Sequence, residues 1–180
     1  MRDQFKNFIN NLLRKTGYQI SRFDTAPYVF RDKLKSFLDE NVPRGKILDI
    51  GSAQWNYPKE HFQNVTTLDL KPPADIIGNI MDLPFDNGSF DCIICLETLE
   101  HVEDPLKAMS EMYRVLKPGG KFIGSAPFAY ELHGEEYGDY WRFTRQCWEK
   151  LLMKNLKNVS IEPYAGKTLA PMGYLVVGIK

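Results

Sequence analysis

The stretch from Lys46 to Leu70, KILDIGSAQWNYPKEHFQNVTTLDL, decides the fold. An apolar run over 47–50 ends at Gly51, and a second run over 65–68 ends at Asp69. This order is typical of a nucleotide-binding β-loop-α-β unit, in which glycine lets the backbone approach the ligand and the later acid accepts from ribose hydroxyls. We expect strands at 46–51 and 65–70, joined by a short helix at 58–62. The stretch therefore predicts a cofactor.

Length and charge limit the classes of protein that this chain can belong to. A chain of 180 residues is most simply one domain. We expect N-terminal helices over 1–43 to cover the site, and a cofactor-binding core over 44–180. The net charge is zero, so no global field favours nucleic acid. Because no apolar run is long enough to span a membrane or to form a signal peptide, a cytoplasmic protein is expected.

The cysteines and histidines predict no metal centre. Cys92 and Cys95 lie three positions apart in an apolar run that reads as a strand, which places them on opposite faces. We interpret them as buried thiols. The three histidines, at 61, 101 and 133, form no cluster with zinc spacing. His101 is expected to anchor the turn before Asp104, with a catalytic role as the less favoured alternative.

The N-terminal part carries two apolar stripes at helical spacing. The first predicts a helix within 1–22 and consists of Phe5, Phe8, Ile9, Leu12 and Leu13. We expect it to pack on the domain or over the site, and a basic membrane-surface helix is the alternative. The second stripe includes Phe30, Leu34, Phe37 and Leu38, and it ends before Pro43.

The rest of the chain alternates between predicted strands and helices. The link over 71–75 is too short for a helix, so the chain is expected to pass directly to a short edge strand at 76–80. The remaining elements are a central strand at 90–96, a helix from Asp104-Pro105 to the stop at 117–120, a strand at 121–126, a loop at 127–143, a helix at 144–156, and strands at 159–164 and 174–179. This pattern predicts an α/β fold with a doubly wound, mostly parallel sheet.

Five motifs occur in a characteristic order: LDIGSAQW, TLDL, GNIMDLPFDNGSFD, LETLEHVEDP and RVLKPGGKF. Together they resemble the class I S-adenosylmethionine-dependent methyltransferases, with the group that includes quinone-biosynthesis enzymes closest. The resemblance covers residues 44–130. It implies S-adenosylmethionine as cofactor and a Rossmann-like sheet of seven strands, with the last strand antiparallel and the helices between strands 1–2 and 2–3 shortened. The later segment PFAYELHGEEYGDYWRFT more loosely resembles members associated with carbohydrate biosynthesis.

The resemblance also implies a set of cofactor-binding residues. Asp69, with Leu70 beside it, is expected to hold the ribose, and Asn79 to accept from the adenine amine. Residues expected to flank the adenine are Ile80 and Met81, with Asp82 close by. Residues expected near the methionine part are Asp49, Gly51, Ser52, Ala53, Leu96 and Glu97. The family loop usually reads Asp-x-Gly-x-Gly-x-Gly, and its last two glycines are Ala53 and Trp55 here, so this loop must turn differently.

The loop over 127–143 is rich in aromatic residues and acids, which suits a small polyhydroxylated acceptor such as a sugar or nucleotide sugar. Alternatively, its aromatics only fold back on the core. We expect Tyr140, Trp141 and Arg142 to contact the acceptor, although Arg142 is also placed to pair with Asp139. His133 is the candidate general base, with Glu131 and Asp139 as rivals.

The favoured hypothesis is methyl transfer from S-adenosylmethionine to a small or sugar-like acceptor at a hydroxyl oxygen. A nicotinamide-dependent oxidoreductase is one rival, but it normally requires G-x-G-x-x-G, and residues 51–56 lack it. A non-catalytic binding protein with the same fold is the other rival, because the glycine loop is altered.

Overall fold

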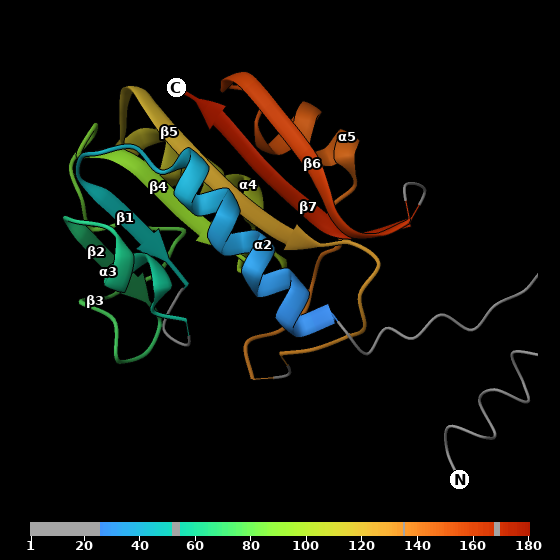
Figure 1. Cartoon of the computed structure of the whole chain (residues 1–180). Coiled ribbons are helices and arrows are strands. Elements are labelled where there is room, and N and C mark those ends of the chain that lie inside the picture. Colours follow the sequence, from blue (N-terminus) through green and yellow to red (C-terminus); the bar gives the residue numbers. More distant parts are fainter. Residues whose placement is uncertain (1–25, 52–54, 135, 168–169) are drawn as a thin grey trace, which may run out of the picture.

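A computed structural model of the chain describes residues 26–51, 55–134, 136–167 and 170–180 (Figure 1). The helix predicted within 1–22 lies outside the described residues, as do Ser52 and Ala53. The elements are α2 (Ala26–Asn41), β1 (Ile47–Ile50), α3 (Tyr57–His61), β2 (Val65–Asp69), β3 (Ile76–Ile77), β4 (Phe90–Leu96), η1 (Leu99–His101), α4 (Pro105–Val115), β5 (Leu116–Pro127), α5 (Arg145–Cys147), η2 (Trp148–Leu152), β6 (Lys157–Lys167) and β7 (Ala170–Ile179).

One seven-stranded sheet organises the described residues, in the order β3-β2-β1-β4-β5-β7-β6. The pairs β1·β2, β1·β4, β2·β3 and β4·β5 are parallel, whereas β7 is antiparallel to both β5 and β6. The strand order reverses between β1 and β4, and ligands of open α/β sheets bind beyond the carboxyl ends of the strands at this point. The predicted mostly parallel sheet with an antiparallel last strand is confirmed.

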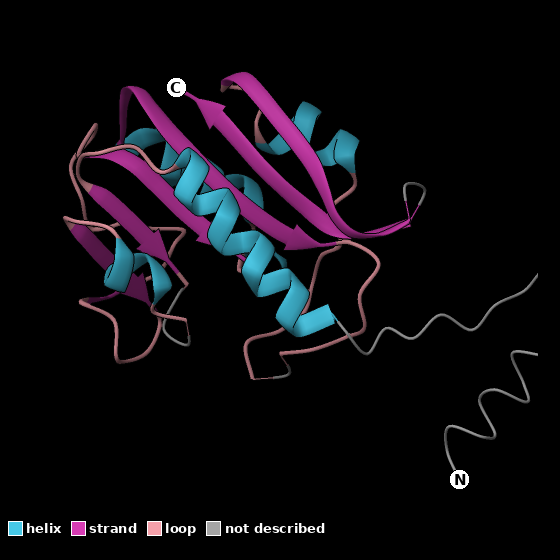
Figure 2. Ribbon diagram, viewed as in Figure 1, coloured by secondary structure: helices cyan, strands magenta, loops and turns pink. Residues whose placement is uncertain are grey.

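Helices cover both faces of the sheet (Figure 2). On one face, Leu34, Phe37 and Leu38 of α2 pack in a cluster with β1 and β4. On the other face, a larger cluster joins the buried side of α4 to Trp148 and the sheet. Cys92 belongs to the first cluster and Cys95 to the second, so the prediction that these thiols are buried on opposite faces is confirmed.

Local sequence explains where α4 begins and ends. Asp104 is the N-cap, and its Oδ1 accepts a hydrogen bond from the Lys107 amide at 2.9 Å. Pro105 occupies the first turn, as predicted. The helix ends at Val115, but β5 begins at Leu116 and not at the predicted residue 121. The two glycines at 119 and 120 are held in the strand because their backbones pair with Lys180 at the end of the chain.

The predicted helix over 144–156 is wrong in extent. Thr144 caps a single α-helical turn over 145–147, and the chain then forms a π-helical turn over 148–152. The Met153 amide donates to the Trp148 carbonyl at 2.9 Å. This wider turn brings Trp148, Leu152 and Met153 into the core together, and packing thereby overrides the α-helical pattern.

The link between β2 and β3 contains no helix, as predicted, although β3 is shorter than the expected 76–80. Asp75 fixes this link to β2, because its carboxylate accepts from the Thr67 amide and hydroxyl, both at 3.0 Å. Lys59 of α3 donates to the same carboxylate. Asp91, the acid at the start of β4, accepts from the Lys46 amide at 2.8 Å.

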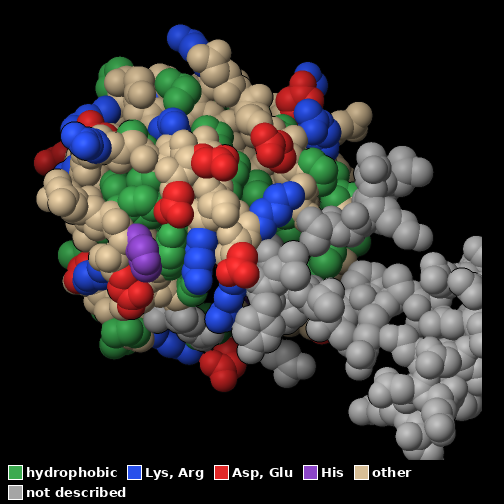
Figure 3. All heavy atoms as spheres, viewed as in Figure 1, with side chains coloured by type: hydrophobic (Ala, Val, Ile, Leu, Met, Phe, Trp, Pro, Cys, Tyr) green, Lys and Arg blue, Asp and Glu red, His purple; other side chains and the backbone are tan. Residues whose placement is uncertain are grey.

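The face of the molecule that carries α2 shows acidic and basic side chains interspersed rather than one charged field (Figure 3). Within the described part of the chain, no helix is both long and apolar enough to cross a membrane.

Candidate functional site

Gly51 lies where the carboxyl end of β1 meets the loop after β4. Its φ is +78°, and a Cβ built there would lie 2.2 Å from Oγ1 of Thr98. Only glycine tolerates both this backbone conformation and this approach. Gly51 thus lies directly against Thr98 of the loop after β4, at the carboxyl ends of these two strands. Asp49, two residues before Gly51, is buried within β1.

Asp69 and Leu70 lie at the carboxyl end of the neighbouring strand, β2. The Leu70 amide donates to Oδ1 of Asp69 at 2.7 Å, and the Leu70 side chain is exposed. The structure thus brings the predicted ribose acid to the same edge of the sheet as Gly51.

The predicted adenine-binding residues form a tight turn after β3. The Met81 amide donates to Oδ1 of Asn79 at 2.9 Å, and the Asp82 amide donates to the Asn79 carbonyl at 3.0 Å. Ile80 is buried in the core, whereas Asn79 remains exposed. An amide oxygen has two lone pairs, so Asn79 keeps the capacity to accept a second hydrogen bond.

Glu97 follows Leu96 at the end of β4 and has a φ of +45°, a strained conformation for a residue with a side chain. Its amide donates to the Ser125 carbonyl at 3.1 Å, and its carboxyl accepts from the Tyr164 hydroxyl. Burial, followed by the charge of Glu100, raises the pKa of Glu97 to about 8. Strain and a raised pKa together are typical of functional sites.

Glu100 is a site residue that the sequence reasoning missed. Its side chain is 0% exposed, and none of the described residues donates a hydrogen bond to either carboxyl oxygen. The carbonyl of Glu100 accepts from the amides of Tyr140 at 2.8 Å and Trp141 at 3.2 Å. The indole of Trp141 donates to the Val102 carbonyl at 2.9 Å. These bonds fasten the loop after β5 onto η1 and the residue that follows it.

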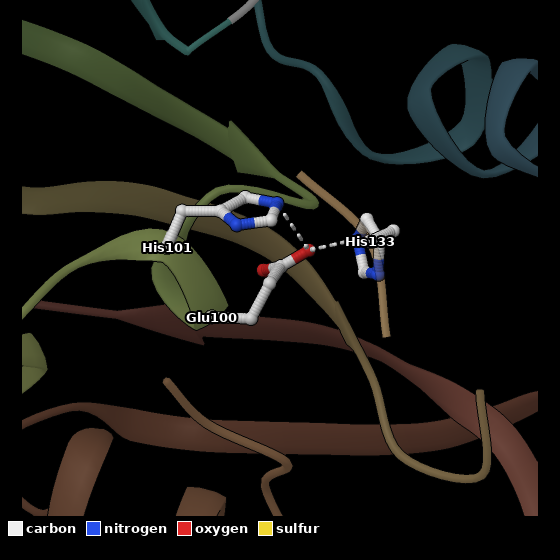
Figure 4. A group of neighbouring side chains, drawn as sticks. All are labelled: Glu100, His101 and His133. Atoms are coloured by element: carbon white, nitrogen blue, oxygen red, sulfur yellow. Dashed lines mark ion pairs between the residues drawn. The ribbon is translucent and has the colours of Figure 1, made fainter. Parts of the chain in front are cut away.

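Two histidine side chains converge on one carboxyl oxygen, Oε1 of Glu100 (Figure 4). Nε2 of His101 lies 3.7 Å from this oxygen, and Nε2 of His133 lies 3.8 Å from it. His101 comes from η1 and His133 from the loop after β5. The Nδ1 atom of His101 contacts the Gly138 carbonyl, so His101 anchors the loop rather than the turn before Asp104, which corrects that prediction.

His133 is partly buried, with 32% of its side chain exposed. Its Nδ1 lies 3.1 Å from the Glu131 carbonyl, and its amide donates to Oδ2 of Asp139 at 2.9 Å. The Glu100 carboxyl is the largest cause that raises the pKa of His133. His133 is thus held beside a buried acid and still reaches solvent.

Arg142 pairs with Asp139, the structural alternative considered above. Its guanidinium donates to both oxygens of Asp139, with Nη2–Oδ2 at 2.8 Å, and also to the Glu131 carbonyl at 3.0 Å. This pairing lowers the pKa of Asp139. By contrast, Tyr140 and Trp141 are 51% and 42% exposed, so both residues of this loop reach solvent.

Comparison with known proteins shows which family part of the chain resembles. A family model described as "Methyltransferase domain" matches residues 48–124, which contain β1, the turn at Asn79, β4 and α4. Over these residues the chain is similar to the class I S-adenosylmethionine-dependent methyltransferases, the family that the five motifs resemble. S-adenosylmethionine is accordingly the cofactor of the family, as the five motifs indicated. The exposed Asn79, whose amide oxygen can accept a second hydrogen bond, fits a ligand that carries an amino group, as the adenine of this cofactor does.

Two curated methyltransferases illustrate the relationship in sequence. A demethylmenaquinone methyltransferase of Listeria monocytogenes is 32% identical over 124 residues, or 68% of this chain and 52% of the relative. The enzyme of the same description from Oceanobacillus iheyensis is 36% identical over 120 residues, or 64% and 49%. The chain thus spans about half the length of the curated relatives that it matches.

Solved structures share the methyltransferase fold. A possible histamine N-methyltransferase of Thermotoga maritima superposes with a TM-score of 0.64 at 19% identity, over 100% of both chains. The 1,6-didemethyltoxoflavin-N1-methyltransferase of Burkholderia thailandensis, solved with S-adenosylhomocysteine, gives a TM-score of 0.63 at 18% identity, over 87% of this chain and 80% of that one. These identities support the fold alone.

Proposed function

We propose that this chain transfers a methyl group from S-adenosylmethionine to a hydroxyl oxygen of a small acceptor. The observation that carries the proposal is the gathering of Gly51, Asp69 and Glu97 at the carboxyl edge where the strand order reverses. Asp69 would hold the ribose and Asn79 the adenine amine. Residues 49–53 would form the loop beside the methionine part, with Leu96 and Glu97 across from it.

Bound S-adenosylmethionine supplies an activated methyl group on a positively charged sulfur. The protein has to hold the acceptor oxygen in line with that methyl group and opposite the sulfur, and much of the rate comes from this positioning. The new bond joins the acceptor oxygen to the methyl carbon, the bond from sulfur to that carbon breaks, and the hydroxyl proton goes to a base. The loop at 127–143, fastened onto η1, would form the acceptor wall.

We assign the base to His133 on geometric grounds. Its Nδ1 faces the Glu131 carbonyl, so this nitrogen carries the proton and Nε2 carries the lone pair. The buried Glu100 carboxyl, 3.8 Å from Nε2, would stabilise the imidazolium that forms. Among the rivals, Asp139 is committed to Arg142, and the lowered pKa of Asp139 makes it a weak base.

A polyhydroxylated molecule such as a sugar or nucleotide sugar is the acceptor class that we favour. The exposed faces of Tyr140 and Trp141 offer platforms for apolar sugar faces, and the polar rim of the loop offers hydrogen bonds. A quinone-type acceptor is the second candidate, because the two relatives in sequence are named demethylmenaquinone methyltransferases. A planar ring would stack on the same aromatic faces.

Transfer of isotope-labelled methyl groups from S-adenosylmethionine tests the proposal. Purified protein is incubated with panels of sugars, nucleotide sugars and reduced quinones, and the products are identified by mass spectrometry. We expect methyl incorporation at oxygen in one panel, with loss of the signal in the Asp69→Ala variant. Binding of S-adenosylhomocysteine without methyl transfer to any panel would instead support the non-catalytic alternative.

A further inference from the structure

Glu100, His101 and His133 lie together at the edge of the proposed acceptor site, and their arrangement has a feature that general base catalysis leaves unexplained. A fully buried carboxyl normally has hydrogen-bond donors, since burying one without them is costly. Glu100 has no such donor among the described residues, and both histidines direct Nε2 toward the same oxygen at distances beyond a hydrogen bond.

Nε2 of each histidine is oriented as in a metal ligand. His101 Nδ1 contacts the Gly138 carbonyl, and His133 Nδ1 contacts the Glu131 carbonyl. A proton on each Nδ1 is donated to a carbonyl, which leaves the Nε2 lone pairs directed at Glu100. Histidines that bind metals almost always donate their other ring N–H in this way, because the bond fixes the tautomer and the ring orientation.

We propose that Glu100, His101 and His133 form a binding site for one divalent transition-metal ion. Their ligand atoms all lie within 4.8 Å of one another. In a tetrahedral site with bonds of about 2.0–2.1 Å, two ligand atoms are separated by about 3.3 Å. The observed 3.7 and 3.8 Å from the two histidines to the carboxyl oxygen exceed this separation by a few tenths of an ångström, and the two histidine nitrogens lie within 4.8 Å of each other. Gly134 permits the close seating of the loop, because a Cβ there would lie 2.6 Å from the His101 ring.

The donor set indicates the class of ion. Two imidazole nitrogens and one carboxylate oxygen suit Zn²⁺, Mn²⁺, Fe²⁺ or Co²⁺, whereas Mg²⁺ prefers oxygen ligands. Three protein ligands leave coordination positions open to small molecules. His133 is 32% exposed and Glu100 is 0% exposed, so solvent reaches the cluster on the His133 side while the carboxyl is buried.

A bound ion would change how the acceptor is activated. With Nε2 of His133 ligated, this nitrogen could no longer act as the base. A hydroxyl oxygen would instead bind the ion directly, and the ion would lower the pKa of that hydroxyl so that the proton leaves to water. This role rests on the proposed methyl transfer, whereas the binding of the ion does not. Metal binding is therefore measured without acceptor or S-adenosylmethionine, so that the two proposals can fail separately.

Chelator-treated protein, titrated calorimetrically with Zn²⁺, tests the site. We expect one equivalent to bind, and the affinity to fall at least 100-fold in His133→Ala, His101→Ala and the conservative Glu100→Gln. The matched control is His61→Ala, since His61 is the third histidine of the chain and lies on α3, outside the cluster. Circular dichroism checks that each variant is folded.

Co²⁺ absorption provides a second readout that excludes cysteine ligands. The half-buried Cys147 is the accessible thiol among the described residues, so the titration is done in Cys147→Ser protein. We expect visible d–d bands that vanish in Glu100→Gln, and no thiolate charge-transfer band. Absence of stoichiometric binding, equal loss in His61→Ala, or retention in all three cluster variants would overturn the proposal. An affinity for Mg²⁺ equal to that for Zn²⁺ would contradict the assignment of the site to transition-metal ions.

Discussion

Asp75 and Glu100 are two acids beside the same sheet, and their carboxyl groups differ in exposure and in hydrogen bonding. Asp75, whose side chain is 39% exposed, accepts hydrogen bonds from Lys59 and from both the amide and the hydroxyl of Thr67. Glu100 is fully buried and receives no hydrogen bond on its carboxyl from any described residue. The accessible acid is thus satisfied, and the inaccessible one is not.

The difference separates residues that serve the fold from residues that serve a ligand. The bonds of Asp75 fasten a link that is too short for a helix, and they require nothing further from solvent or ligand. Glu100 is oriented by its backbone, which holds Tyr140 and Trp141, while its carboxyl faces two histidines. A buried carboxyl without hydrogen-bond donors is destabilising, so such an acid indicates a function.

The largest effect is expected from His133→Ala, which removes the exposed member of the Glu100 cluster. Turnover should fall by about 10²–10⁴-fold, the range for a lost acid–base group, with S-adenosylhomocysteine affinity unchanged. His61→Ala is the matched control and should retain full turnover. Normal turnover in His133→Ala would show that Glu100 and the two histidines beside it take no part in the reaction.

Asp69→Ala should weaken S-adenosylhomocysteine binding by about 10–100-fold. A hydrogen bond to a charged group contributes about 1.5–3 kcal/mol, and this acid is the proposed ribose acceptor. Asp75→Asn, six positions further along, should bind the ligand as the wild type does. Calorimetry with both variants measures the two affinities. Equal affinity losses would show that Asp69 and Asp75 do not differ in their role in binding.

Gly51→Ala should lower the free energy of unfolding by about 1–2 kcal/mol from the positive φ alone, with a further cost from the contact with Thr98. Chemical denaturation measures the change. In a Thr98→Ala background the cost should be smaller, because part of the obstructing side chain is gone. Identical costs in both backgrounds would mean that the two loops do not approach each other as described.

The smallest effects come from the two compared acids themselves. The Lys59 ammonium, followed by Thr67, lowers the pKa of Asp75 from 3.8 to about 2. Its stabilising contribution is therefore present above about pH 4 and is lost as the pH falls toward 2. Asp75→Asn should cost less than about 1 kcal/mol near neutral pH, since the pair is more than a third exposed.

The cost of Asp75→Asn should vanish near pH 2, which denaturation at several pH values tests. Glu100→Gln in metal-free protein should show an unfolding free energy equal to or above that of the wild type, because it removes a buried acid without donors. A marked loss of stability in Glu100→Gln would show that this carboxyl, like that of Asp75, supports the fold.

Local patterns predicted the elements that depend on local chemistry. The apolar run at 90–96 forms β4 with the expected bounds, and Asp104-Pro105 begins α4. The shortness of the link at 71–75 correctly predicted direct passage to β3. These predictions succeed because strand hydrophobicity, capping and chain length act over a few residues.

The remaining features depend on contacts between distant segments. The π-helical turn at 148–152 follows from packing of Trp148 and Met153 on the core, which no local spacing reveals. Glu100 was missed because the loop that buries it arrives about 40 residues later in the chain, at Tyr140 and Trp141. The available signal was the repetition of acids in LETLEH directly after a buried strand.

Calorimetric titration of the purified chain with S-adenosylhomocysteine and, separately, with NAD tests most directly the claim that the carboxyl edge of the sheet is a methyltransferase cofactor site. We predict one equivalent of S-adenosylhomocysteine bound per chain, no heat from NAD, and weakened binding in Asp69→Ala but not in Asp75→Asn. Binding of NAD, or no binding of S-adenosylhomocysteine, would contradict the account.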